Sequence, residues 1–358
     1  MQNLFDGIYK DKTVLVTGHT GFKGSWLCLW LEEMGANVIG YSLEAPTTPN
    51  HIELLDLDMV SIVGDIRDLE KLNSTMVEYK PEIVFHLAAQ PLVRLSYENP
   101  IETYETNVIG TLKVLEACKA NNVKSIVNIT SDKAYENKEW VWGYRECDPM
   151  GGYDPYSSSK GCAELLVSSY RNSYFNVNDY KKTHNTLIAS CRAGNVIGGG
   201  DWALDRLMTD IMVSVSKGKK VSIRNPNATR PWQHVLEPLS GYLLVGQKLL
   251  QEKVEFADGW NFGPSDEGSI TVEQVVENVK KHWSKIDYEI NKDPDQLHEA
   301  NLLKLDCSKA HTYLKWSAVW ESDKTFEMTV RWYKEYYENS KTISKEQLNE
   351  YIENIQGQ

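Results

Sequence analysis

Short apolar runs alternate with longer amphipathic stretches along the first half of the chain. The apolar runs are rich in Val, Ile, Leu and Phe, and they cover 13–17, 36–41, 60–68, 83–90, 125–130 and 185–192. Runs of this length that are apolar throughout are typical of strands buried on both faces of a parallel sheet. The stretches between them carry apolar residues at helical spacing. The pattern predicts an α/β fold with a doubly wound, mainly parallel sheet.

Three glycines spaced three apart follow the first predicted strand and precede a predicted helix at 25–31. Glycines let a backbone approach a pyrophosphate closely, and the start of a helix offers it unpaired N–H groups and a partial positive charge. The loop therefore predicts a dinucleotide site in a Rossmann domain over 1–194, although a simple turn is the alternative. Its residues are Gly18, His19, Thr20, Gly21, Phe22, Lys23 and Gly24.

The ends of the next strands supply further cofactor candidates. Ser42 ends the second strand, Glu44 follows, and no Lys or Arg lies between Gly40 and Asn50, so we expect NAD rather than NADP. The fourth strand ends in the cofactor candidates Leu87, Ala88 and Ala89, of which the two alanines are small enough for a flat ligand to approach closely. Asp65 and Ile66 follow the third strand. An Asp in this acidic turn can bind an adenine amino group or cap the helix from Leu69, and both readings remain open.

The regular alternation ends in a glycine-rich loop at 194–202. We expect residues 195–358 to form a smaller substrate-binding α/β domain. Strands near 221–224 and 260–262 are candidates to return to the first domain. One late helix begins at Val272, and another carries several aromatic residues that are expected to pack in a core. These are Phe326, Trp332, Tyr333 and Tyr336.

Composition narrows the function classes. The 358 residues carry a formal net charge of −12, which disfavours nucleic acid as a partner. Six scattered cysteines without metal-ligand spacing predict free thiols and no metal site. The chain shows no signal-peptide core or membrane-spanning run, so we expect a cytoplasmic protein. His86 and His234 are expected to satisfy hydrogen bonds in the core.

A tyrosine and a lysine four residues apart are the main catalytic candidates. Asp154 can cap a helix that starts with Pro155, which places Tyr156 and Lys160 on one helical face. A phenol with a pKa of about 10 is a weak base at neutral pH, but a nearby ammonium group stabilises its phenolate. Ser131 follows a strand end and can share or position a substrate hydroxyl.

These residues resemble the extended short-chain dehydrogenase/reductase family. The glycine loop, Ser131 and the Tyr156–Lys160 pair carry the resemblance. Ser131-Asp132-Lys133 is similar to the catalytic triplet of nucleotide-sugar 4,6-dehydratases. The segments 87–91 and 230–239 resemble the branch that acts on CDP-glucose, where Lys replaces the usual Glu of the triplet. The resemblance implies hydride transfer from sugar C4 to NAD, loss of water from C5–C6, and return of the hydride to C6.

The elimination needs one group to take the C5 proton and another to protonate the departing C6 hydroxyl. Asp132 suits the acid and Lys133 the base, while the reverse assignment and a purely electrostatic role for Lys133 stay open. Arginine matches phosphate geometry, so Arg230 is the first candidate for the diphosphate. Other substrate candidates are Gln90, Arg94, Asn195, Arg206 and Asn261.

Two other functions remain possible from the sequence. A 4-epimerase of the same family would lack the elimination, and such enzymes usually carry a small residue in place of Asp132. A noncatalytic NAD-binding scaffold would not need Ser131, Tyr156 and Lys160. Helices near 100–119 and 156–175 resemble the pair through which the family dimerises, so a homodimer or higher homo-oligomer is expected.

Overall fold

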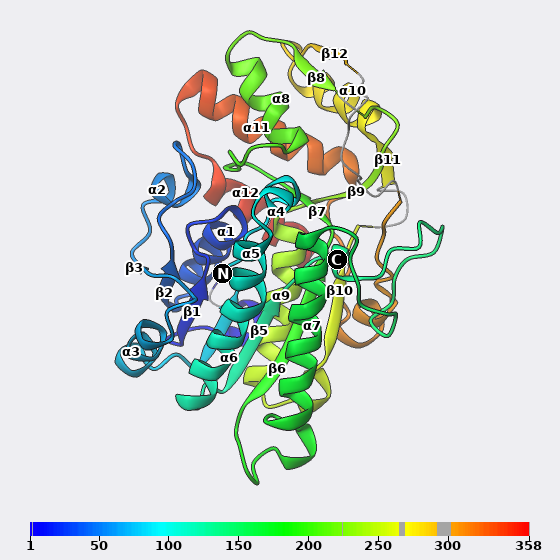
Figure 1. The fold of residues 1–358 in the computed structure, drawn as a ribbon. Coiled ribbons are helices and arrows are strands. Elements are labelled where there is room, and N and C mark those ends of the chain that lie inside the picture. The colour runs from blue at the N-terminus through cyan, green and yellow to red at the C-terminus, as the bar shows by residue number, and fades with distance from the viewer. Residues whose placement is uncertain (2, 224, 265–268, 292–301, 358) are drawn as a thin grey trace.

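A seven-stranded parallel sheet forms the centre of the computed structural model, which describes residues 1, 3–223, 225–264, 269–291 and 302–357 (Figure 1). The strand order is β10-β6-β5-β4-β1-β2-β3. Crossing from β1 to β4 reverses the direction of winding, as in a doubly wound sheet. The strands are β1 Thr13–Thr17, β2 Asn37–Ser42, β3 Val60–Val63, β4 Ile83–His86, β5 Ser125–Ile129, β6 Leu187–Ala193 and β10 Gly259–Phe262. The predicted fold class is confirmed.

Alternating residues of the central strands enter two separate cores. Val14 and Val16 of β1 pack with α1 and α9 on one face, whereas Leu15 packs on the other face with α3, α6 and α7. This two-sided burial explains why these strands are apolar throughout. The helices of this region are α1 Phe22–Glu33, α2 His51–Leu55, α3 Leu69–Tyr79, α4 Val93–Glu98, α5 Pro100–Tyr104, α6 Thr111–Ala120, α7 Pro155–Ser173 and α9 Leu236–Leu250.

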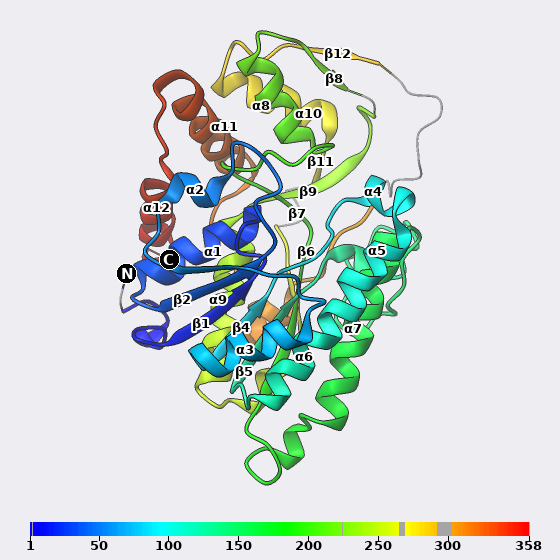
Figure 2. The ribbon, with the colours of Figure 1, turned by 60° about the vertical axis from the view of Figure 1, so that its left-hand side comes forward.

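Two small sheets and several helices lie beyond the carboxyl ends of the central strands (Figures 1 and 2). One sheet has the order β11-β9-β7 and the other pairs β12 with β8. The strands are β7 Asn195–Ile197, β8 Val221–Ile223, β9 Thr229–His234, β11 Ser269–Thr271 and β12 Tyr288–Ile290. The helices of this region are α8 Leu207–Ser216, α10 Val272–His282 and α11 Ser322–Asn339, whereas α12 Ser344–Gln356 lies beside α1 (Figure 2).

Segments of the second half are shared between the two regions. β10 pairs with β6 in the central sheet, as expected for a returning strand. The strand at 221–223 does not return, because it pairs with β12. The polar tail after Asn339 forms α12, which was not predicted; its Tyr351 packs edge-on against Trp30 of α1, 5.7 Å between ring centroids. The division of the chain at residue 194 stays a prediction.

The helix that carries the predicted catalytic pair begins as expected. The Asp154 side chain accepts a hydrogen bond from Ser157 N at 2.9 Å, and Pro155 takes the first helical position. The preceding helical rod consists of α5, a π-helical turn at Glu105–Gly110 and α6. It packs along α7 (Figure 2). These contacts fix the position of Tyr156 and Lys160 near the carboxyl ends of the central strands.

Candidate active site

A cavity of about 1350 Å³ lies between the carboxyl ends of the central strands and the second region. It brings together most of the residues that the sequence predicted for cofactor, substrate and catalysis. These are Gly18, Thr20, Gly21, Phe22, Lys23, Gly24, Ser42, Asp65, Ile66, Leu87, Ala88, Ala89, Gln90, Arg94, Ser131, Asp132, Lys133, Tyr156, Lys160, Asn195 and Arg206. Residues far apart in sequence therefore share one site.

The glycine loop is shaped as a cradle that side chains would fill. Gly18 has φ +77°, and a methyl group there would lie 2.7 Å from Ala88 N. A methyl group on Gly24 would lie 2.1 Å from Gly18 O. Gly21 precedes α1 and provides no side-chain cap, so the first N–H groups of this helix are available to an anion. This geometry fits the pyrophosphate of a dinucleotide.

The sequence left open whether an Asp after β3 binds adenine or caps the next helix, and in the structure two different residues lie at these two positions. The Asp68 side chain accepts a hydrogen bond from Lys71 N and caps α3. Asp65 lines the cavity and pairs with Arg67 at 2.6 Å, which, through its hydrogen bonds, lowers the pKa of the Asp65 carboxyl. Ser42 also lines the cavity and is 2.9 Å from the Thr20 hydroxyl. Asp65 and Ser42 are therefore placed where an adenosine could be bound.

Tyr156 and Lys160 are both buried on the inner face of α7. Burial raises the pKa of Tyr156 to about 12, and the Ser131 hydroxyl opposes this only in part. Burial lowers the pKa of Lys160 to about 8, and the Glu164 carboxylate opposes that shift. The groups of the chain alone thus leave Tyr156 protonated at neutral pH. Its use as a base requires a further positive charge beside the phenol.

The triplet after β5 forms a tight, buried turn. Ser131 Oγ donates to Asp132 Oδ1 at 2.9 Å and accepts from Lys133 N at 3.2 Å. The Lys133 ammonium lies 3.4 Å from the same Asp132 oxygen. Asp132 is only 2% exposed, whereas Lys133 reaches further into the open cavity with a side chain 27% exposed. The acid and the amine form a contact pair that can exchange protons.

Lys23 of the glycine loop lies closer to this chemistry than its place in the motif indicated. Burial, helped by the nearby charges of Arg206, Lys160 and Lys133 and opposed by Asp132, lowers the pKa of its ammonium group to about 7. The Lys23 side chain thus extends from the glycine loop to the neighbourhood of the catalytic residues. Arg206 pairs with Asp201 at 2.6 Å, and Arg94 lies 3.6 Å from Asp205.

Two predicted site residues, His19 and Asn261, are not brought to the cavity. The His19 ring lies beneath Gly40 and is 2.7 Å from Ser61 Oγ, so its side chain is part of the sheet packing. Asn261 is fully buried, accepts from the Tyr135 hydroxyl and donates to Tyr144 O and Asp306 O, which leaves its amide no donor for a substrate. The side chain of Arg230 lies outside the described residues.

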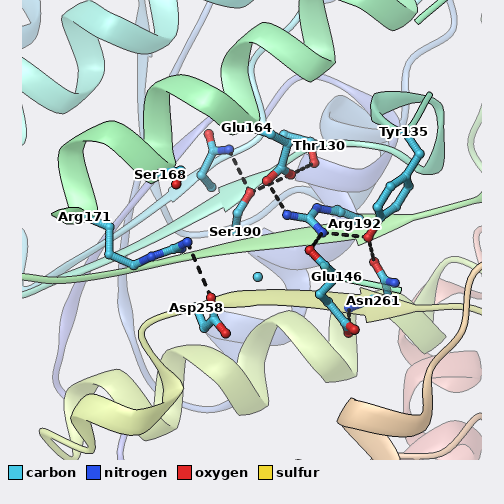
Figure 3. A network of polar contacts seen from close by, with 12 residues as sticks. Thr130, Tyr135, Glu146, Glu164, Ser168, Arg171, Ser190, Arg192, Asp258 and Asn261 are labelled. Atoms are coloured by element: carbon cyan, nitrogen blue, oxygen red, sulfur yellow. Dashed lines mark hydrogen bonds and ion pairs between the residues drawn. The ribbon is translucent and has the colours of Figure 1, made fainter. Parts of the chain in front are cut away.

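Several residues that were not predicted from the sequence form buried contacts with α7, next to the cavity. Glu164 and Arg192 form a buried ion pair at 2.7 Å between α7 and β6 (Figure 3). Charged residues are rarely buried unless they are paired, so an Arg at the end of an apolar strand was an available signal. Asn107 donates to Ser159 Oγ of α7 at 2.8 Å and to Gln90 O at 3.1 Å.

His86 takes the structural role expected of it. Its ring nitrogens lie 2.7 Å from Thr17 Oγ1 and 3.0 Å from Thr111 Oγ1. Burial lowers the pKa of His86 to about 3, so the ring stays neutral. Within the described ranges, no three His, Cys, Asp or Glu side chains come together as a metal site needs.

The fold and the site define a member of the extended short-chain dehydrogenase/reductase class. The family model described as GDP-mannose 4,6 dehydratase matches residues 15–329. The chain belongs to that family, and the resemblance to nucleotide-sugar 4,6-dehydratases is confirmed. Among its relatives, CDP-glucose 4,6-dehydratase of Salmonella typhimurium is 56% identical over 96% of this chain and 97% of the relative.

More distant proteins share the fold. dTDP-D-glucose 4,6-dehydratase of Dictyostelium discoideum is 26% identical over 76% of this chain and 63% of the relative. The crystal structure of dTDP-glucose 4,6-dehydratase from Bacillus anthracis in complex with NAD superposes with a TM-score of 0.74 at 21% identity, covering 92% of this chain and 100% of that one. The crystal structure of UDP-glucose 4-epimerase from Thermus thermophilus in complex with NAD superposes with a TM-score of 0.77 at 23% identity. The match covers 90% of this chain and 99% of that one.

No helix among the described residues has the length and apolarity that crossing a membrane demands.

Proposed function

We propose that this protein is an NAD-dependent CDP-glucose 4,6-dehydratase, which converts CDP-D-glucose to CDP-4-keto-6-deoxy-D-glucose and water. The observation that carries the proposal is the shared cavity: the glycine loop, the Ser131-Asp132-Lys133 triplet and the Tyr156–Lys160 pair all line it. The 56% identity to the Salmonella typhimurium enzyme supports the choice of substrate.

The cradle described above supports a cofactor site at the glycine loop. Gly18, Gly21 and the first turn of α1 would hold the pyrophosphate, with Lys23 nearby, and Ser42 and Asp65 would hold the adenosine. A nicotinamide bound there would supply the acceptor for the C4 hydride and the donor for its return to C6, so the reaction would have no net oxidation. The positive charge of the oxidised nicotinamide would also lower the pKa of the Tyr156 phenol, which burial raises in the protein alone.

The side chains of the protein move the protons. The Tyr156 phenolate, stabilised by the Lys160 ammonium, takes the proton from the C4 hydroxyl while Ser131 holds that oxygen. The resulting ketone makes the C5 hydrogen acidic. Lys133 then takes the C5 proton, and Asp132 gives a proton to the departing C6 hydroxyl, which leaves as water.

The proton count closes within the site. After the hydride has returned to C6, Lys133 gives its proton back to C5. The proton on Tyr156 replaces the one that Asp132 lost, and the Ser131 hydroxyl, which contacts Tyr156 and donates to Asp132 at 2.9 Å, provides the route. Arg206 and Arg94 are the described cationic candidates for the substrate diphosphate, together with Arg230, and Gln90 and Asn195 for further hydrogen bonds.

The substrate assignment is tested with a panel of nucleotide sugars at equal concentration: CDP-, dTDP-, UDP- and GDP-glucose, and GDP-mannose. Product is followed by the loss of one water in the mass spectrum and by the absorbance of the 4-keto sugar in base. The proposal requires the highest kcat/KM on CDP-glucose. A higher value on another nucleotide sugar would overturn the choice of base but leave the dehydratase chemistry standing.

We further propose that the protein acts as a homodimer or higher homo-oligomer in the cytoplasm. Exposed apolar side chains on the α5–α6 rod and on α7 support an interface there, notably Ile101, which is 75% exposed, Ile109 and Leu165. None of the six cysteines is joined in a disulfide, which supports a reducing compartment. Light scattering behind size-exclusion chromatography gives the oligomeric state. An Ile101→Glu/Leu165→Glu variant should run as a monomer.

A further inference from the structure

A buried ion pair lies directly behind the catalytic turn. Glu164 is one helical turn beyond Lys160 and two beyond Tyr156, so all three side chains lie on the same face of α7. Its Oε2 pairs with Arg192 Nη2 at 2.7 Å, and the two side chains are 3% and 6% exposed. Burying two charges costs several kcal/mol each unless their hydrogen bonds are satisfied, so such a pair is weak evidence of a purely stabilising role.

The pair holds both ends of the catalytic segment (Figure 3). At one end, Glu164 Oε1 accepts from the hydroxyl of Thr130, the residue before Ser131, and from Ser190 Oγ at 2.8 Å. At the other end, Arg192 Nη1 donates to the Tyr135 hydroxyl at 2.6 Å. Ser131, Asp132 and Lys133 therefore lie between two residues that contact the same ion pair.

The surroundings are built to keep this pair in place. A methyl group on Gly259 of β10 would lie 2.8 Å from Arg192 Nη2, so glycine leaves the space that the guanidinium fills. The Tyr135 hydroxyl itself donates a hydrogen bond to Asn261 Oδ1 at 2.8 Å, which explains why Asn261 is buried here rather than at the substrate. The contacts join α7, β5, β6 and β10 in one network.

The geometry points to a positioning role: the Glu164–Arg192 pair holds the Ser131-Asp132-Lys133 turn close to Tyr156 and Lys160. The groups proposed for oxidation and those proposed for elimination can then act on the same bound sugar. This rests on the proposed function for the identity of the reaction. Catalytic groups must be held to well within about 1 Å, and a displacement of that size costs up to about 100-fold in rate.

The pair also acts on the charge of Lys160. Besides Glu164 on α7, the titratable groups that face Lys160 are Lys23 on α1 and His86 on β4. His86 is neutral, so Glu164 is the described anion that keeps Lys160 protonated against burial. Burial raises the pKa of Glu164 itself, but Arg192, Thr130 and Ser190 outweigh it and lower that pKa, so the carboxylate stays ionised.

The test uses the full chain with Glu164→Gln, which keeps the shape and removes the charge. We expect kcat to fall about 10- to 100-fold with KM changed less than about twofold, and the alkaline limb of the kcat profile to move down by about one pH unit. Asp258→Asn is the matched control. It removes the ion pairs of Asp258 with Arg171 of α7 at 3.4 Å and with Lys309 at 2.5 Å, and it should leave both quantities unchanged.

A second readout does not depend on the substrate. Lysine labelled with ¹³C at Cε reports the pKa of Lys160 by NMR, with the signal assigned from Lys160→Arg. Glu164→Gln should lower that pKa by about one unit. If the wild type fails to turn over CDP-glucose while this shift occurs, the proposed function falls and the electrostatic part of the positioning role stands.

A double variant guards against simple unfolding. Glu164→Gln/Arg192→Met removes both charges, so no unpaired buried charge remains. It should recover the thermal stability of the wild type but neither kcat nor the pKa of Lys160. Recovery of both to wild-type values would show that the pair only stabilises the fold, and would overturn the inference.

Discussion

Gly18 packs so closely against Ala88 that a methyl group on Gly18 would lie 2.7 Å from the Ala88 nitrogen. This contact joins the turn after β1 to the end of β4, and Gly18 takes φ +77° to make it. The floor of the proposed pyrophosphate site therefore depends on the absence of a side chain.

Gly18→Ala should weaken NAD binding at least about tenfold, because the loop must move away from Ala88 to accept the methyl group. Isothermal titration with NAD measures the effect. Gly218→Ala is the matched control, since Gly218 also has positive φ but nothing lies within 4 Å of the added carbon. The control should lose about 1 kcal/mol of stability and retain its affinity for NAD. Equal affinities of both variants for NAD would remove the glycine loop from the cofactor site.

Tyr156→Phe should lower kcat by about 10²- to 10⁴-fold, the usual contribution of a positioned base. NAD affinity should change little, because the ring itself remains. Tyr174→Phe at the exposed end of the same helix serves as the control and should behave as the wild type. Steady-state rates and titration calorimetry give both numbers. Full turnover by Tyr156→Phe would exclude the phenol as the base.

Asp132→Asn should separate oxidation from elimination. The amide cannot protonate the departing C6 hydroxyl, whereas Tyr156, Ser131 and Lys160 remain for the first step. We expect the near-ultraviolet absorbance of reduced nicotinamide to rise in a single turnover and persist, with no water lost from the sugar. A variant that makes product at the wild-type rate without this signal would show that Asp132 is not the acid.

Glu237 gives a prediction about stability and pH outside the site. Burial raises the pKa of this carboxyl from 4.5 to about 7, although Val319 N, Trp320 N and the Tyr351 hydroxyl donate to it. The folded state thus holds the proton more tightly than the unfolded chain. Its contribution to the free energy of unfolding is full below pH 4.5 and is lost as the pH rises through about 7.

Urea unfolding at about pH 5 and about pH 8 measures this contribution. The wild type should lose a few kcal/mol more between these values than Glu237→Gln, which cannot ionise. An equal loss in both proteins would mean that Glu237 ionises at its ordinary pKa in the fold.

The sequence was most informative where local chemistry decides the structure. The cap at Asp154 and the four-residue spacing of Tyr156 and Lys160 depend on neighbouring residues alone, and both lie as predicted. The apolar strands follow from two-sided burial. In contrast, α12 lies in a polar stretch, and only its packing on α1 makes its Tyr351 a core residue.

Contacts between side chains that are far apart in the sequence could not be predicted from it. Asn261 was a candidate for hydrogen bonds to the substrate, but Tyr135, Tyr144 and Asp306 use its amide. The pairing of Glu164 with Arg192 joins positions 28 apart in sequence, and neither residue identifies the other. Such contacts depend on strand order and helix placement, which local patterns do not specify.

The central claim is that hydrogen leaves C4 of the sugar and returns to C6 of the same molecule, with dehydration in between. CDP-glucose deuterated at C4 tests this directly, with the product examined by NMR and mass spectrometry. The account predicts a 4-keto-6-deoxy sugar that has lost one water and carries the deuterium at C6. Deuterium retained at C4 of an inverted sugar would identify an epimerase, and unchanged substrate would identify a noncatalytic protein; either result would contradict the account.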